Sequence, residues 1–167
     1  MGYQEHKHAA PKSVNCAVLT ISNTRTEHDD ESGQLILQTL KRNGHQIMSY
    51  CILKNEANSI RKKLNELLAE ESLQVIITSG GTGVSHSDVT VETIYPLLEK
   101  KLDGFGELFR SLSYREIGSG SIMSRAMAGV AREKVILCLP GSVGAARLAM
   151  EQIILPELGH LVREATR

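Results

Sequence analysis

The chain has 167 residues, and its 19 Lys and Arg residues balance its 19 Asp and Glu residues, so its formal net charge is zero. This length suits one domain, which buries roughly two thirds of the surface that the unfolded chain exposes. A zero net charge lacks the basic excess of proteins that grip nucleic acid or anionic membranes. We therefore expect a small-molecule site and neither a nucleic-acid nor a membrane partner.

Residues 1–13 read as a flexible polar arm, and residues 14–167 as a single α/β domain. The arm lacks the apolar core of a signal peptide, and no run reaches the roughly 18 apolar residues of a membrane span. Its His6 and His8 are weak candidates for metal binding, because histidines in polar terminal arms are more often unstructured. Cys16, Cys51 and Cys138 show no Cys-x-x-Cys spacing. They indicate free core thiols in a cytoplasmic protein.

Strands and helices alternate in the first half of the chain. Buried strands are predicted over residues 16–22, 45–53 and 75–78, the third with a continuous apolar run. Between them, apolar positions recur at helical spacing. These positions are Gly33, Ile36, Leu37 and Leu40, and then Ile60, Leu64, Leu67 and Leu68. Asn43 and Gly44 are expected to end the first helix, and Asn58 or Ser59 to cap the second.

A glycine-rich loop, formed by Ser79, Gly80, Gly81, Thr82 and Gly83, follows the third strand. Glycines permit positive φ and consecutive exposed N–H groups, which suit a phosphate-bearing ligand. The spacing matches neither a dinucleotide fingerprint nor a P-loop, so a tight strand-to-helix turn is the alternative interpretation.

A helix is predicted directly after this loop, with Val91, Ile94, Tyr95 and Leu98 at helical spacing. Its N-terminus would face the loop and favour an anion there. Asp88 stands just before this helix. The carboxylate is a candidate for holding Mg²⁺ on bound phosphates or orienting a nucleophile, and helix capping is the alternative.

The second half predicts a helix over residues 103–116, in which Phe105, Leu108, Phe109 and Leu112 share one face. Core packing is the plainer interpretation of that face, and a subunit contact is the alternative. A Gly/Ser run over residues 118–124 reads as a loop near a site. Residues 126–131 and 135–139 flank Arg132-Glu133-Lys134 and predict an antiparallel hairpin.

Pro140, Gly141 and Ser142 end the hairpin's second strand and lead into a last helix, which Pro156 is expected to kink or end. The whole order predicts a three-layer α/β/α fold with a mostly parallel sheet and the third strand at its centre. Both loops would then open at the same sheet edge, where open α/β sheets bind ligands. Ser124 and Arg125, at the end of the Gly/Ser run, are expected to belong to the same site. Arg125 is a candidate phosphate clamp, and an unpaired surface residue is the alternative interpretation.

These motifs resemble the MoaB/Mog family of molybdenum cofactor biosynthesis proteins. The motifs that carry the resemblance are residues 78–83, 87–90, 104–110, 124–126 and 140–142. It covers nearly the whole chain from about Val14, and residues 104–110 point to the MoaB branch. It implies a molybdopterin-binding α/β domain that forms a trimer or hexamer. In active members of the family, ATP and Mg²⁺ are used to adenylylate the terminal phosphate of molybdopterin, which implies catalytic roles for Asp88 and Glu56.

One departure from the family pattern bears on catalysis. Active members carry Pro-Asp-Asp or Pro-Asp-Glu after the second strand, where this chain has Lys54, Asn55 and Glu56. Asn55 can ligate Mg²⁺ through its carbonyl but contributes no charge. Two hypotheses therefore stay open: a molybdopterin adenylyltransferase, and a non-catalytic molybdopterin carrier.

Overall fold

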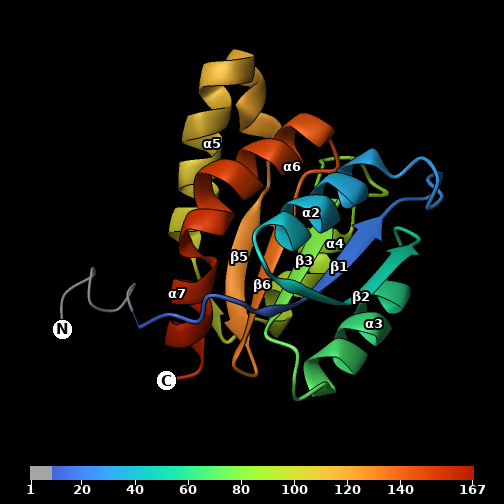
Figure 1. Cartoon of the computed structure of the whole chain (residues 1–167). Helices are drawn as coiled ribbons and strands as arrows, with labels where there is room; N and C mark the ends of the chain where they lie inside the picture. Colours follow the sequence, from blue (N-terminus) through green and yellow to red (C-terminus); the bar gives the residue numbers. More distant parts are fainter. Residues whose placement is uncertain (1–8) are drawn as a thin grey trace.

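The computed structural model describes residues 9–167, and it contains a six-stranded sheet between two layers of helices (Figure 1). The strands are β1 (Asn15–Ile21), β2 (Gln46–Leu53), β3 (Val75–Ser79), β4 (Lys100–Lys101), β5 (Met127–Ala131) and β6 (Lys134–Leu139). Their order across the sheet is β2-β1-β3-β6-β5-β4. β1, β2, β3 and β6 are parallel, and β5 is antiparallel to β6 and β4. The predicted fold class and the central place of the third strand are confirmed.

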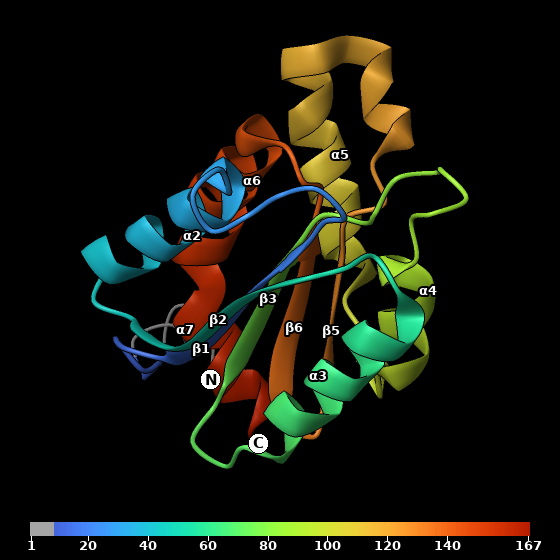
Figure 2. The ribbon, with the colours of Figure 1, turned by 90° about the vertical axis from the view of Figure 1, so that its right-hand side faces the viewer.

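The helices divide between the two faces of the sheet. They are α2 (Glu31–Arg42), α3 (Ala57–Ala69), α4 (Thr90–Ile94), α5 (Asp103–Ile117), α6 (Val143–Ala149) and α7 (Leu155–Ala165). In Figure 2, α2, α6 and α7 lie on one side of the strands and α3 and α4 on the other, while α5 extends beyond the end of the sheet. None of the helices in the described residues is long and apolar enough to span a membrane.

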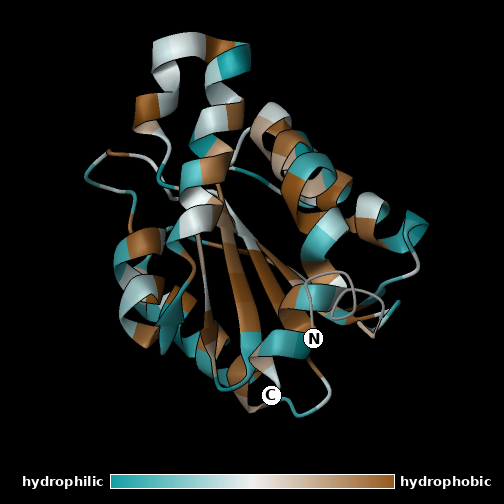
Figure 3. Cartoon of the chain, turned by 90° about the vertical axis from the view of Figure 1, so that its left-hand side faces the viewer, coloured by the Kyte–Doolittle hydropathy of each residue, from teal (hydrophilic) through white to brown (hydrophobic). Residues whose placement is uncertain are grey.

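Successive side chains of the central strands point to opposite faces of the sheet, so each helical layer packs on its own hydrophobic core. In β1, Cys16 and Val18 face one layer, and Ala17 and Leu19 face the other. A strand that is buried on both faces reads as a continuous apolar run, which is how β3 was recognised in the sequence. The strands accordingly form a largely hydrophobic band between the helices (Figure 3).

Two local predictions in the first half of the chain were wrong. α3 begins at Ala57 with Glu56 at the N-cap position and no side-chain cap, so neither Asn58 nor Ser59 caps it. The helix after the glycine loop is short: α4 ends at Ile94 and continues only as the 3₁₀ turn η1 (Tyr95–Leu97). Pro96 lies in that turn and lacks the N–H that a longer α-helix would need there.

The second half also differs in detail from the prediction. The Gly/Ser run forms the 3₁₀ helix η2 (Gly118–Met123) instead of an irregular loop. The hairpin turn needs only two residues, Arg132 and Glu133, both with positive φ. The chain stays helical past Pro156, because a π-helical segment, η3 (Met150–Ile154), precedes α7 and Pro156 lies in the first turn of α7.

The aromatic face of α5 is core. Phe105 and Phe109 are buried within the chain, whereas Leu108 is exposed, so the two phenylalanines cannot anchor a neighbouring subunit. Among the cysteines, Cys16 and Cys138 are buried, but Cys51 is only half-buried because β2 is an edge strand. His6 and His8 lie outside the described residues, and Pro11 of the predicted arm contacts α7 through its carbonyl beside Gly159.

Candidate functional site

A cavity of about 440 Å³ lies at the carboxyl ends of β1, β3 and β6. It collects predicted site residues from three separate stretches of the chain. Those that line it are Ser79, Gly80, Gly81, Thr82, Gly83, Asp88, Ser124, Pro140, Gly141 and Ser142. β3 and β6 are adjacent and parallel, so the loops that follow them emerge at the same edge. Gly141 lies against Gly80, where an added Cβ would come within 3.1 Å of the Gly80 Cα.

The glycine loop has a backbone that only glycine suits. Gly80 has φ +102° and Gly81 has φ +65°. A Cβ at Gly80 would lie 2.3 Å from the carbonyl oxygen of Ile21, and a Cβ at Gly81 would lie 2.2 Å from the hydroxyl of Thr90. The loop therefore needs glycine both for its dihedral angles and for its close contacts.

Three successive N–H groups of this loop are unused. The N–H of Gly80 donates to the carbonyl of Leu139 at 2.9 Å. By contrast, the N–H groups of Gly81, Thr82 and Gly83 donate no hydrogen bond to any residue that the structure describes. Thr82 is buried, and Gly81 and Gly83 are partly buried beside the cavity. Successive backbone N–H groups without an internal acceptor suit an anion such as a phosphate.

Asp88 lies beside this loop and does not cap the following helix. Its Oδ2 accepts the N–H of Ser85 at 3.1 Å, and its Oδ1 accepts the side-chain amide of Asn55 at 3.3 Å. The N-cap position of α4 belongs to Val89, without a side-chain cap. An added Cβ at Gly83 would lie 2.6 Å from Asp88 Oδ2, which places the carboxylate next to the unused N–H groups.

Asn55 joins the loop after β2 to the start of α4. Its side-chain amide donates to Asp88, its Oδ1 accepts the N–H of Val89 at 3.2 Å, and its own N–H donates to Asn23. Within residues 9–167, no three His, Cys, Asp or Glu side chains gather as a metal site. Mg²⁺ is nevertheless often held by one carboxylate together with ligand phosphates and waters, and Asp88 fits that pattern.

Two predicted site residues lie outside the cavity. Glu56 is exposed on the loop after β2, where it accepts a hydrogen bond from Ser59. Arg125 lines a neighbouring cavity of about 430 Å³, and its guanidinium pairs with Glu92 and donates through Nε to the carbonyl of Thr82 at 2.9 Å. The hydrogen bond from Arg125 lowers the pKa of Glu92, and the same bond raises the pKa of Arg125, so both groups are charged at neutral pH. Arg125 is thus paired and not the unpaired surface residue of the alternative interpretation.

The loop after β6, formed by Pro140, Gly141 and Ser142, uses its polar groups to cap a helix. Ser142 is the N-cap of α6 and accepts the N–H of Ala145 through its hydroxyl at 3.2 Å. Its carbonyl accepts the N–H of Ala146. Ser142 therefore serves its own helix first, although it also lines the cavity.

Sequence reasoning missed several residues that line the cavity. Ser22 and Arg25 come from the loop after β1, and the position of that loop at the carboxyl end of a parallel strand was the signal that could have found them. Ile117 and Met123 come from the protruding end of α5 and η2, and they are 61% and 53% exposed. Their position depends on how α5 crosses the sheet edge, which no local pattern reveals.

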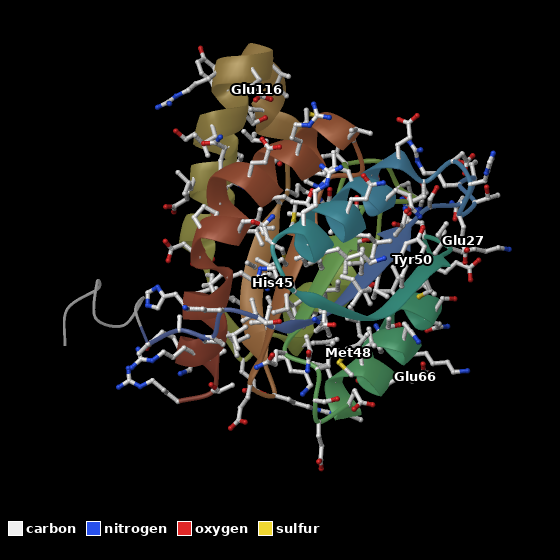
Figure 4. The ribbon with its side chains drawn as sticks, in the orientation of Figure 1. Glu27, His45, Met48, Tyr50, Glu66 and Glu116 are labelled. Carbon is white, nitrogen blue, oxygen red and sulfur yellow. The ribbon has the colours of Figure 1, made fainter. Side chains whose placement is uncertain are left out.

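A buried carboxylate beneath the cavity was also missed. Asp30 is 1% exposed, caps α2 through the N–H of Gly33 and accepts hydrogen bonds from Thr20 and Tyr50, each at 2.6 Å. Burial, and then the bond to Asp30, raises the pKa of Tyr50, which is labelled on β2 in Figure 4. Asp30 therefore ties β1, β2 and α2 together below the site, and an Asp at a helix start was the available signal.

Known proteins resemble the chain over almost its full length. The model of a family described as "Probable molybdopterin binding domain" matches residues 17–160. Molybdenum cofactor biosynthesis protein B of Bacillus cereus is 49% identical over 100% of this chain and 99% of its own length, and the Bacillus subtilis protein of the same name is 47% identical over 98% and 97%.

Solved structures agree with these relatives. A crystal structure of molybdenum cofactor biosynthesis protein B superposes with a TM-score of 0.90 at 49% identity, covering 93% of this chain and 98% of that one. The tungsten cofactor synthesizing protein MoaB from Pyrococcus furiosus has a TM-score of 0.86 at 36% identity, covering 95% and 100%. The chain therefore belongs to the MoaB/Mog family of molybdenum cofactor biosynthesis proteins.

Proposed function

We propose that this protein binds molybdopterin and transfers AMP from ATP to its terminal phosphate, with Mg²⁺ as the cofactor. The observation that carries the proposal is the row of unused N–H groups at Gly81, Thr82 and Gly83 with the carboxylate of Asp88 beside it. The N–H groups suit a phosphate, and the carboxylate suits a cation bound to phosphates.

The roles of the residues follow from their positions. The glycine loop would hold the terminal phosphate of molybdopterin, so that one of its oxygens attacks the α-phosphorus of ATP and pyrophosphate leaves. Asp88 would hold Mg²⁺ together with the phosphates, and the ion would supply positive charge for the transferring group. Ser22 and Arg25, which line the same cavity, offer further donors to an anionic ligand.

A second function, molybdopterin binding without adenylylation, is favoured by one contact. The amide of Asn55 donates to Asp88 and so occupies one of the carboxylate oxygens that a cation would otherwise use. A carrier needs only the phosphate loop and a slot for the pterin. The two functions therefore differ in whether Asp88 serves chemistry or only supports the loop.

We also propose that the protein assembles as a trimer or hexamer. The apolar side chains suited to a subunit contact lie on α5 and η2, not on the Phe105/Phe109 face. They are Leu108, Tyr114, Ile117, Ile122 and Met123, which are 47–81% exposed. Sedimentation at micromolar concentration tests this proposal, and a monomer there would contradict it.

Titration of the purified protein with molybdopterin, with and without Mg-ATP, tests the proposed function, and Asp88→Asn separates the two forms of it. For the enzyme, the variant should bind molybdopterin but lose adenylylation by about a hundredfold or more, because placed charge is most of phosphoryl-transfer catalysis. Formation of adenylylated molybdopterin, followed by chromatography, is the measurement. Binding without turnover in the wild type would favour the carrier, and absence of binding would contradict both.

A further inference from the structure

Three successive carbonyls of the glycine loop, those of Gly80, Gly81 and Thr82, are held by residues outside the loop. The hydroxyl of Thr90, a fully buried residue, donates to the carbonyl of Gly80 at 2.9 Å, and the N–H of Thr90 donates to that of Gly81 at 3.0 Å. Nε of Arg125 donates to the carbonyl of Thr82 at 2.9 Å. Three successive peptide groups are therefore fixed through their oxygens.

This arrangement sets the direction of the following N–H groups. In a planar trans peptide, the C=O and the N–H of the next residue point in opposite directions, and the described chain has no cis peptide bond. The N–H groups of Gly81, Thr82 and Gly83 consequently point away from Thr90 and Arg125. These are the three N–H groups without a partner among the described residues, and all three residues line the cavity.

Arg125 is itself held in place by Glu92. Two guanidinium nitrogens of Arg125 donate to the two carboxylate oxygens of Glu92, one of them at 3.2 Å. With Nε on Thr82, each of the three guanidinium nitrogens donates to the loop backbone or to Glu92. The planar fork of an arginine can satisfy both partners at once, whereas a lysine ammonium offers no such fixed geometry.

We propose that Thr90, Arg125 and Glu92 are positioning residues that preset the N–H groups of Gly81, Thr82 and Gly83 for a tetrahedral phosphate group. This inference rests on the proposed function and assigns Arg125 an indirect part in it: the side chain orients the loop and does not touch the phosphate. Donors that already point at the ligand need no reorganisation when it binds, which raises affinity.

The indirect role and a direct clamp predict opposite effects of one substitution. In a direct clamp, Glu92 competes with the phosphate for Arg125, so Glu92→Gln would strengthen phosphate binding. In the positioning role, Glu92 keeps Arg125 on the carbonyl of Thr82, so Glu92→Gln should weaken it. The side chain of Glu92 is 55% exposed, so the substitution does not threaten folding.

The experiment is a titration of the perdeuterated protein with inorganic phosphate, followed by ¹H–¹⁵N correlation spectra. In the wild type, the amide protons of Gly81, Thr82 and Gly83 should shift downfield together as they donate to phosphate. Glu92→Gln and Arg125→Lys should weaken phosphate binding by about tenfold, because the carbonyl of Thr82 loses the charge-assisted hydrogen bond that orients its peptide group. The Gly83 shift should shrink most, because the Gly83 N–H shares a peptide group with the Thr82 carbonyl, which loses its hydrogen bond from Arg125.

Arg110→Gln is the matched control, because Arg110 lines the same neighbouring cavity as Arg125 but holds no loop carbonyl. It should bind phosphate as the wild type does.

Thr90→Val should reduce the Gly81 shift, with its folding checked by the same spectra. Tighter phosphate binding by Glu92→Gln, or loop shifts identical in all variants, would overturn the positioning role while leaving molybdopterin binding intact. A wild type that binds molybdopterin without loop shifts would overturn the role as well, whereas loss of molybdopterin binding itself contradicts the proposed function.

Discussion

The two ends of the parallel strands use their backbone polar groups in different ways. At the amino ends, polar side chains close the hydrogen bonds of the turns: Asn15 N–H donates to Gln74, Asn15 Nδ2 donates to the carbonyl of Ser72, and Val14 N–H donates to His45. At the carboxyl ends, the N–H groups of Gly81, Thr82 and Gly83 find no acceptor in the described residues. The edge that only stabilises the fold thus pairs its backbone polar groups within the chain, whereas the binding edge keeps N–H donors available for a ligand.

Apolar patterning alone could not separate these two ends. Both border the same buried strands, and the central strand β3 contributes to each. The distinction lies in glycines with positive φ at the carboxyl end and in Asn, Gln and His at the amino end. It can be tested by substitutions that affect one end and leave the other unchanged.

The largest effect is expected at Gly80. Gly80→Ala forces an L side chain into φ +102° and places its Cβ 2.3 Å from the Ile21 carbonyl oxygen. We expect the free energy of unfolding to fall by about 3 kcal/mol, together with loss of ligand binding, as measured by urea denaturation and molybdopterin titration. Gly144→Ala is the control, because Gly144 lies within α6 and an added Cβ meets nothing within 4 Å. It should be neutral or stabilise by up to about 1 kcal/mol. Equal effects of the two substitutions would contradict the special role of the loop.

The sequence predicted the fold and the content of the cavity better than the roles of single side chains. Buried strands and amphipathic helices have periodic signatures, and parallel connection fixes which loops meet, so the two loops could be assigned to one edge. Arg125 and Asp88 were placed near the site, but their hydrogen bonds depend on partners more than 30 residues away, Glu92 and Asn55. Such pairings follow from tertiary structure and leave no local pattern. The length of α4 was overestimated because the spacing of apolar residues continues through Pro96.

A smaller effect is expected at Asn55, whose side chain satisfies one oxygen of Asp88 at the carboxyl end. Asn55→Asp replaces a donor to Asp88 Oδ1 with a second carboxylate, and two like charges in hydrogen-bond distance repel each other. Without divalent cations, the variant should lose about 1–2 kcal/mol of stability relative to the wild type. Mg²⁺ should restore the loss, because a carboxylate pair is a better cation site than a carboxylate and an amide. Thermal unfolding with and without Mg²⁺ measures both effects.

The catalytic consequence of Asn55→Asp separates the two proposed functions. If the missing carboxylate limits adenylylation, the variant should show higher Mg²⁺-dependent turnover than the wild type. The double variant with Asp88→Asn is the control, since it keeps one carboxylate and should respond to Mg²⁺ less. No turnover in either the wild type or Asn55→Asp, with molybdopterin binding intact, would assign the protein to the carriers.

The smallest effect is expected at the amino end, at His45, which Figure 4 shows well away from Glu116 on the protruding α5. His45 is 9% exposed, and its Nδ1 accepts the N–H of Val14 at 3.3 Å, which requires that this nitrogen be unprotonated. Burial lowers the pKa of His45 below its ordinary value of 6.5. The unfolded chain therefore binds a proton at a higher pH than the folded chain does.

The sign of the pH dependence follows from that difference. Well above pH 6.5 the histidine is neutral in both states, and its full contribution to stability is present. As the pH falls through 6.5, the unfolded state gains the proton first and stability declines. We expect a loss of less than about 1 kcal/mol between pH 7 and pH 5.5, measured by urea denaturation, which His45→Gln should reduce. Because the amino end does not contact the cavity, phosphate-induced amide shifts of the glycine loop should be the same in His45→Gln and the wild type. A change in those shifts would show that the two ends of the sheet are coupled, and the contrast between a self-satisfied edge and a binding edge would then fail.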